Sequence, residues 1–189
     1  MKAKVPQNER LSQAEPLELK ALFESHYNSI CQLLFRLGVP RLDLDDAAQE
    51  VFWVAARRLN DIERGREHAF LYGVALRISY HARRKWQTHD APLSPLELVG
   101  ELHSERPNPE QVLGERQAEK ILHAALGQLA PDLKAVFVLY ELEELELKEI
   151  AAIVEIPLGT VNSRLRRARS EFGGICKRLQ AITKREVQP

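Results

Sequence analysis

The side chains with the clearest capacity for chemistry lie between residues 147 and 172, where amide, hydroxyl and guanidinium groups recur at helical spacing. At about 100° per residue, a helix that starts near residue 160 has an apolar stripe formed by Val161, Leu165, Ala168 and Phe172. The arc opposite this stripe carries Asn162, Ser163, Arg166 and Arg167, flanked by Arg164 and Arg169. Asn and Arg side chains can make two-point contacts with base edges, and arginines also reach phosphates, so the pattern predicts a DNA-reading helix.

A shorter amphipathic helix precedes this one and completes a recognisable motif. Its apolar face consists of Leu147, Ile150, Ala151 and Val154. Pro157 disfavours helical geometry at the residue before it, and the Thr160 hydroxyl could cap the amides of the second helix. Two short helices joined in this way form a helix-turn-helix, whose second helix reads the major groove. The alternative is a basic surface helix in a bundle, which the hinge and the two matched stripes make the weaker interpretation.

Charge is segregated along this chain of 189 residues, although its formal net charge is zero. A neutral total by itself argues against nucleic acid. Residues 160–185 are nevertheless strongly basic, with Glu171 as their single acidic residue, and residues 88–113 are acidic, with Arg106 as their single basic residue. This asymmetry is more informative about partners than the total charge, and it fits a basic DNA-binding helix and an acidic connection.

Catalysis, metal binding and membrane insertion find no support in the sequence. The six histidines are scattered and show neither metal-ligand spacing nor a nucleophile motif. Cys31 and Cys176 are too few for a disulfide framework, and their helical apolar surroundings predict two buried thiols in a reducing cytosol. No run is long and apolar enough for a signal peptide or a membrane span. We therefore expect a cytoplasmic protein that is not an enzyme and needs no cofactor or metal.

The apolar periodicity predicts an all-α fold, because no segment shows strand alternation. Long helices are expected to end at Gly38, to open at Asp43–Asp46, and to run from about His68 to Trp86. Further helices are expected to begin at Pro109 and Pro131. The sequence thus predicts a loose tail (1–16), a small helical domain (17–87), an acidic linker (88–109) and a second small helical domain (110–189) that contains the helix-turn-helix.

Stretches in both halves of the chain resemble one family, the extracytoplasmic-function group of bacterial RNA polymerase sigma factors. Residues 45–52, Asp-Asp-Ala-Ala-Gln-Glu-Val-Phe, resemble the family's Asp-x-x-Gln-Glu-x-Phe helix, and residues 156–165 resemble its domain that reads the minus-thirty-five element. Phe70-Leu71-Tyr72-Gly73-Val74-Ala75, with Arg83-Arg84, resembles the helix that opens the minus-ten element. The resemblance implies a sigma factor that binds core RNA polymerase and promoter DNA, helps to melt the promoter, and is held by an anti-sigma factor.

The resemblance also assigns roles to individual residues. Contact with the polymerase is expected from Asp45, Asp46, Gln49, Glu50 and Phe52. Contact with the minus-ten element is expected from Phe70, Tyr72, Arg77, Tyr80, Arg83, Arg84, Lys85 and Trp86, although periodicity alone places Phe70 in the core. For the minus-thirty-five element, base edges are assigned to Asn162, Ser163, Arg166 and Arg167, and phosphates to Lys148, Thr160, Arg164 and Arg169.

The chain departs from the family pattern at several positions. Phe70 replaces a usual Trp, Arg77 a frequent Asn, and His81 a usual Asp. In the second domain, Glu144 and Glu155 replace turn glycines, and Glu146 replaces a Ser cap. Glycine adopts positive φ at little cost, so these turns are expected to be built differently or to be slightly strained.

A stand-alone helix-turn-helix regulator is the main alternative function. Such a protein would bind duplex DNA without polymerase, often at a two-fold half-site. The sequence contains neither a dimerising heptad repeat nor a ligand-pocket pattern, and this alternative leaves the Asp/Gln/Glu helix unexplained. The sigma-factor hypothesis accounts for both stretches.

Overall fold

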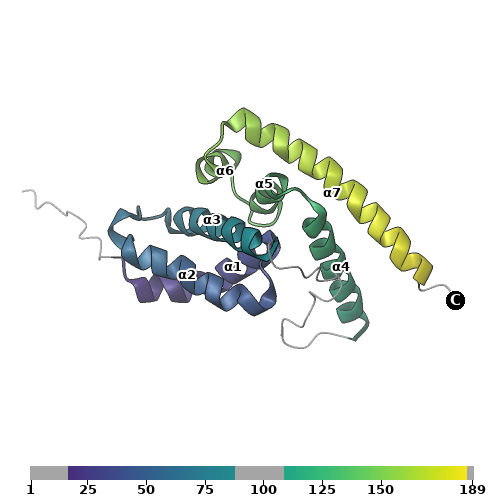
Figure 1. Cartoon of the computed structure of the whole chain (residues 1–189), viewed down its shortest axis with the longest axis horizontal. Helices are drawn as coiled ribbons and strands as arrows, with labels where there is room; N and C mark the ends of the chain where they lie inside the picture. The colour runs from purple at the N-terminus through teal and green to yellow at the C-terminus, as the bar shows by residue number, and fades with distance from the viewer. Residues whose placement is uncertain (1–16, 88–108, 187–189) are drawn as a thin grey trace, which may run out of the picture.

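The computed structural model describes residues 17–87 and 109–186, and all regular structure within these ranges is helical (Figure 1). The N-terminal half comprises α1 (Leu19–Leu37), α2 (Leu44–Arg57) and α3 (Glu67–Gln87), with short 3₁₀ turns at Arg41–Asp43 and Leu59–Asp61. The C-terminal half comprises α4 (Pro109–Gln128), α5 (Pro131–Glu141), α6 (Leu147–Val154) and α7 (Leu158–Glu186). The all-α prediction is confirmed. The acidic linker lies outside the described residues, except for Pro109.

Helix boundaries in the N-terminal half follow the local signals in the sequence. Gly38 ends α1 in the left-handed region (φ 102°), and its backbone N–H donates to the Phe35 carbonyl at 3.0 Å. Asp45 and Asp46 occupy the first turn of α2, where carboxylates favour the positive end of the helix dipole. The predicted helix from His68 to Trp86 is observed as α3 with one further residue at each end.

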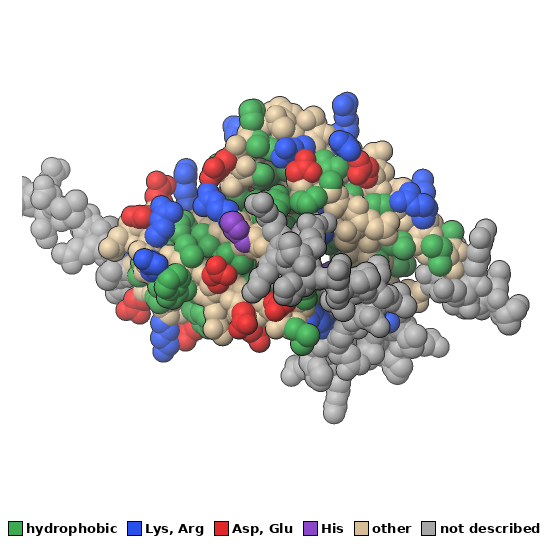
Figure 2. Space-filling model, viewed as in Figure 1, with side chains coloured by type: hydrophobic (Ala, Val, Ile, Leu, Met, Phe, Trp, Pro, Cys, Tyr) green, Lys and Arg blue, Asp and Glu red, His purple; other side chains and the backbone are tan. Residues whose placement is uncertain are grey.

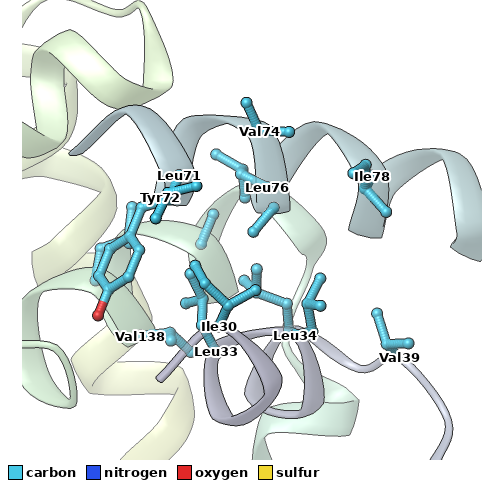
Figure 3. Close-up of a cluster of buried hydrophobic side chains, with 14 of the residues drawn as sticks. Ile30, Leu33, Leu34, Val39, Leu71, Tyr72, Val74, Leu76, Ile78 and Val138 are labelled. Atoms are coloured by element: carbon cyan, nitrogen blue, oxygen red, sulfur yellow. The ribbon is translucent and has the colours of Figure 1, made fainter. Parts of the chain in front are cut away.

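The three N-terminal helices pack pairwise around a common core. Figure 3 shows side chains of α1 (Ile30, Leu33 and Leu34) lying below Leu71 and Tyr72 of α3. Ile30, Leu33, Leu34 and Leu71 are completely buried. Burying a large aliphatic side chain contributes about 1.5–3 kcal/mol, so these contacts fix α1 and α3 relative to each other.

The C-terminal half wraps α5 and α6 against the long helix α7, and α4 also packs on α7 (Figure 1). Pro131 is the first residue of α5, as predicted. The second helix of the helix-turn-helix is longer than its Val161–Phe172 stripe requires, because α7 continues to Glu186. The extension gives α4 a partner and ties the motif to the rest of this half.

The two halves pack against each other across the chain, α1 against α5 and α3 against α6. Their buried side chains form one continuous cluster. At its edge, the Glu143 carboxylate accepts hydrogen bonds from Arg36 (2.7 Å) and from the Tyr72 hydroxyl (2.8 Å). Glu143 is only 7% exposed, so a buried polar contact joins the halves in addition to apolar packing. The sequence had left open whether the two domains meet.

The two cysteines are less buried than predicted. Both thiols are half-buried and unpaired with each other, and partial burial raises the pKa of each one. They lie beside the core and are not sealed inside it, because each occupies the edge of its helix's apolar face. No helix among the described residues is long and apolar enough to cross a membrane. Within residues 17–87 and 109–186, no group of His, Cys, Asp and Glu side chains could hold a metal ion.

Candidate nucleic-acid interface

The turn between α6 and α7 sets the direction of the predicted reading helix. Glu155 adopts the left-handed conformation (φ 57°), and the N–H of Ile156 donates to the Ala151 carbonyl at 3.2 Å. The Pro157 carbonyl then accepts from the N–H of Thr160 (2.8 Å) and of Val161 (3.1 Å). The predicted Thr160 cap is wrong, because α7 begins at Leu158 and places Thr160 inside the first turn. Proline supplies this start because its φ suits a helix N-terminus.

The buried face of α7 is the predicted stripe. Val161, Leu165 and Ala168 are at most 4% exposed, and the Phe172 ring packs on Phe137 with centroids 4.5 Å apart. The opposite face presents exposed polar side chains: Asn162, Ser163, Arg166, Arg167 and Arg169. Thr160, Ser163, Arg164, Arg166 and Arg167 also line a shallow hollow beside Asp132 of α5. The fold therefore brings nearly all of the predicted minus-thirty-five residues to one surface.

Carboxylates of the same half hold three of the four arginines on this surface. Arg164 lies 3.4 Å from Asp132, Arg167 2.7 Å from Glu171, and Arg169 2.5 Å from Glu141. The hydrogen bond from Arg167 to Glu171 raises the pKa of its guanidinium, so the group stays charged. Among the described residues, Arg166 alone of these four arginines forms no ion pair or ring contact. Arg166 is therefore the exposed arginine of this surface that no carboxylate or ring of the described residues holds.

Two polar side chains of the reading face turn back onto their own helix. The Asn162 side-chain amide donates to the Leu158 carbonyl at 3.2 Å, and the Ser163 hydroxyl donates to the Thr160 carbonyl at 2.9 Å. Such local bonds are exchangeable for contacts with a ligand, because both side chains remain exposed. Lys148 is placed differently from the rest of its predicted set. It lines a groove of about 470 Å³ between α3 and α6, together with Phe70 and Arg77.

The predicted minus-ten residues do not form one surface, and several of them already contact other side chains or the backbone. Tyr72 is 7% exposed and bonded to Glu143, so a base cannot reach its ring in this arrangement. Phe70 is half-buried under the guanidinium of Arg58, at 5.6 Å from the ring centroid. Arg77 is exposed and forms an ion pair with Glu155 of the other half. Tyr80 is half-buried, and its hydroxyl donates to the Pro131 carbonyl at 3.4 Å. The side chains of Arg83, Arg84, Lys85 and Trp86 lie outside the described residues.

The predicted polymerase-binding residues divide into a surface and its support. Asp45, Asp46, Gln49 and Glu50 are exposed on α2. The Tyr27 hydroxyl donates to Asp45 at 2.8 Å, which raises the pKa of Tyr27 and fixes one carboxylate. Phe52 is 5% exposed and packs on Phe23 with centroids 4.8 Å apart, so it supports the surface from beneath and is not available as a contact.

An exposed tryptophan beside this surface was missed by the sequence analysis. The Trp53 side chain is 62% exposed, and the Arg57 guanidinium lies 4.7 Å from its ring centroid. The signal was present, because Trp53 follows Gln49 by four residues and therefore lies on the same face of the helix. Exposed tryptophans are enriched among residues that anchor protein interfaces. Figure 2 shows that basic and acidic side chains intermix over the visible face of both halves.

Comparison with known proteins gives one family-model match and several relatives. A family described as Sigma-70, region 4 matches residues 119–172. The ECF RNA polymerase sigma factor SigE of Mycolicibacterium smegmatis is 30% identical over 152 residues, which is 80% of this chain and 58% of that protein. The ECF RNA polymerase sigma-E factor of Haemophilus influenzae is 31% identical over 171 residues, which is 85% of this chain and 88% of that protein. This chain thus spans well under two thirds of the first relative and most of the second.

Solved structures share the fold. The sigma factor RpoE in complex with the anti-sigma factor NepR from Bartonella quintana matches with a TM-score of 0.64 and 19% identity, over 84% of this chain and 96% of that one. CnrH in complex with the cytosolic domain of CnrY matches with a TM-score of 0.61 and 21% identity, over 84% and 87% respectively. The similarity extends across both helical halves.

Proposed function

The chain belongs to the extracytoplasmic-function (ECF) group of RNA polymerase sigma factors, and from this membership we propose that it binds core polymerase, directs it to specific promoters and helps to melt them. It acts in this role without catalysis of its own, in the cytoplasm where the polymerase works. The observation that carries the proposal is the α7 surface, where an exposed Asn/Ser/Arg face lies opposite the buried side chains Val161, Leu165 and Ala168. That geometry suits docking in a major groove.

Each predicted surface has a defined part in this function. Base reading is assigned to Asn162, Ser163, Arg166 and Arg167, and phosphate contact to Thr160, Arg164, Arg169 and Lys148. The exposed side chains of α2 form the polymerase contact, and Trp53 extends it as an apolar anchor. The α3 residues, with Arg83, Arg84, Lys85 and Trp86, keep their predicted role at the minus-ten element. An anti-sigma factor is proposed as a further partner, supported by the two structural neighbours, both of which were solved as complexes.

In vitro transcription with bacterial core polymerase tests the proposal directly. The template is the region upstream of the chain's own gene, and initiation should require both the polymerase and the chain. Gln49→Ala and Arg166→Ala should each reduce specific initiation. Gln180→Ala and Arg178→Ala remove the same side-chain types from exposed positions further along α7 and should leave initiation unchanged. Trp53→Ala should weaken core binding about 5- to 30-fold, because truncating an aromatic anchor costs roughly 1–2 kcal/mol.

Two results would separate this function from its alternative. Failure to bind core polymerase, combined with a shift of duplex DNA by the chain alone at physiological salt, would replace the sigma-factor assignment with a stand-alone regulator. Core binding that survives the combined Gln49→Ala and Trp53→Ala changes would instead move the polymerase contact away from α2.

A further inference from the structure

Two charged residues from different halves meet in the folded chain. Arg77 stands on α3, and Glu155 stands in the turn between α6 and α7. Their side chains form an ion pair across the boundary between the halves. The two residues are 78 positions apart in sequence, so the contact between them exists only in the folded chain.

The turn itself gives no reason for a glutamate at residue 155. Its φ of 57° lies in the left-handed region, which glycine adopts freely and which a residue with a Cβ adopts at a cost. Glu144 adopts a similar φ of 55° and is exposed like Glu155, but among the described residues it forms no ion pair or side-chain hydrogen bond. The cross-boundary contact with Arg77 therefore distinguishes Glu155 from a second glutamate in the same backbone state.

Glu155 is one of three carboxylates that the C-terminal half turns toward the N-terminal half. Glu143 binds Arg36 and Tyr72, and Glu149 lies 3.9 Å from His68. The groove between α3 and α6 is lined by Phe70, Arg77, Lys148 and Glu155, among others, so it contains residues assigned to both promoter elements. A carboxylate on Arg77 occupies the guanidinium that a DNA phosphate would otherwise bind.

We propose that Glu155 is an intramolecular latch, which pairs with Arg77 to hold the two halves closed and to shield the minus-ten surface of α3 until the halves separate. This proposal rests on the proposed function for the identity of the shielded surface, but the closure itself does not depend on it. Glu143 supplies the buried part of the closure. The Arg77–Glu155 pair is more than half exposed and supplies a weaker part that salt screens.

Small-angle X-ray scattering of the full chain at 0.05 M and 0.5 M salt tests the latch. Glu155→Arg should raise the ratio of open to closed chains about three- to tenfold at low salt, since it replaces an attraction by a repulsion of similar size. Arg77→Glu should do the same, and the double charge swap should restore the wild-type radius of gyration. Glu144→Arg is the matched control, because it makes the same charge change in the same backbone conformation without an opposing partner.

Equal opening by Glu155→Arg and Glu144→Arg, or failure of the double swap to close the chain, would overturn the latch. Shielding is tested by the fluorescence anisotropy of a labelled single-stranded oligonucleotide, taken from the promoter at which the transcription assay maps initiation upstream of the chain's own gene. Glu155→Gly should bind about threefold more tightly than Glu144→Gly, and equal binding by the two variants would overturn the shielding. Transcription by the wild-type chain decides the proposed function separately, so failure of the latch and failure of the sigma-factor role are distinguishable.

Discussion

The helices α7 and α3 both carry cations that are assigned to DNA, but the structure treats them in opposite ways. On α7 the partners of Arg164, Arg167 and Arg169 all belong to the same half, and the reading face is exposed. On α3 the partners of Tyr72 and Arg77 are glutamates of the other half. Except for Lys148, the residues assigned to the minus-thirty-five element lie on one surface of their own half. Among the residues assigned to the minus-ten element, Tyr72 and Arg77 are engaged by the other half.

This difference teaches that a carboxylate beside an arginine can have two purposes. Glu141 and Asp132 orient arginines that remain on an open surface, and this preorganisation lowers the entropy cost of binding. Glu155 joins two separate units, so its ion pair must break before Arg77 can act elsewhere. The two kinds of pair differ in where their partners lie in the sequence. Arg164–Asp132 and Arg169–Glu141 each lie within the C-terminal half, whereas Arg77–Glu155 joins the two halves.

The largest expected effect comes from the buried side of the reading helix. Leu165 is 4% exposed in the core of the C-terminal half. Leu165→Ala should lower the free energy of unfolding by about 2–5 kcal/mol, because it leaves a cavity in the core. Arg166→Ala, one residue away on the exposed side, should change it by less than about 0.5 kcal/mol. Urea denaturation followed by circular dichroism measures both, and equal effects would refute the assignment of faces.

Substitutions on the exposed face of α7 should weaken DNA binding and leave the stability of the fold nearly unchanged. Arg166→Ala should weaken binding of a duplex that contains the minus-thirty-five element by about 1–3 kcal/mol and relax specificity at one base position. Arg169→Ala should weaken binding to all duplexes alike and reduce the salt dependence. Electrophoretic shift or anisotropy titrations with a matched and a scrambled duplex separate the two roles. Uniform loss from Arg166→Ala would assign that residue to a phosphate.

Acid should loosen the contact between the halves through His123. This side chain packs on Phe35 of the other half, with ring centroids 4.0 Å apart, and it is 12% exposed. Burial, and then the charges of Arg41, Arg36 and Lys134, lower the pKa of His123 to about 4 from 6.5. The unfolded chain therefore binds the proton more readily than the folded chain below pH 6.5. This contribution to stability is complete above pH 6.5 and is lost as the pH falls toward 4.

The size of this loss at pH 5 is about 2 kcal/mol relative to pH 7, since each unit below 6.5 costs about 1.4 kcal/mol. The Glu119 carboxylate, 3.8 Å from His123, opposes the effect only in part, because it is itself partly exposed to solvent. His123→Gln should flatten the change in denaturation midpoint between pH 7 and pH 5. An unchanged slope in this variant would assign the acid sensitivity to carboxylates.

The smallest expected effect comes from Glu143, whose carboxylate joins the two halves. Glu143→Gln keeps an acceptor for Tyr72 but removes the charge that faces Arg36, so it should lower the free energy of unfolding by about 1 kcal/mol. Glu144→Gln, on the exposed adjacent residue, should have no measurable effect. Urea denaturation compares the two variants. Equal midpoints would show that apolar packing alone closes the halves.

Most helices could be predicted because their signals are local. Gly38, Pro131 and Pro157 mark boundaries through backbone constraints that act on adjacent residues, and the structure follows each of them. The apolar stripe of α7 was predictable for the same reason, because side chains three and four residues apart share a face. The predicted Thr160 cap is wrong because α7 begins two residues earlier, at Leu158, directly after Pro157.

The sequence by itself determined the all-helical fold, the helix-turn-helix and the exposed polar face of α7, because each depends on residues within a few turns of one another. Only the tertiary structure decided that Phe52 supports the α2 surface, that Tyr72 is buried against Glu143, and that Arg77 meets Glu155. These outcomes depend on contacts between helices: Phe52 packs on Phe23 of the neighbouring α1, whereas Tyr72 and Arg77 contact glutamates of the C-terminal half. No periodicity within a single helix encodes which of its polar residues will face another part of the chain.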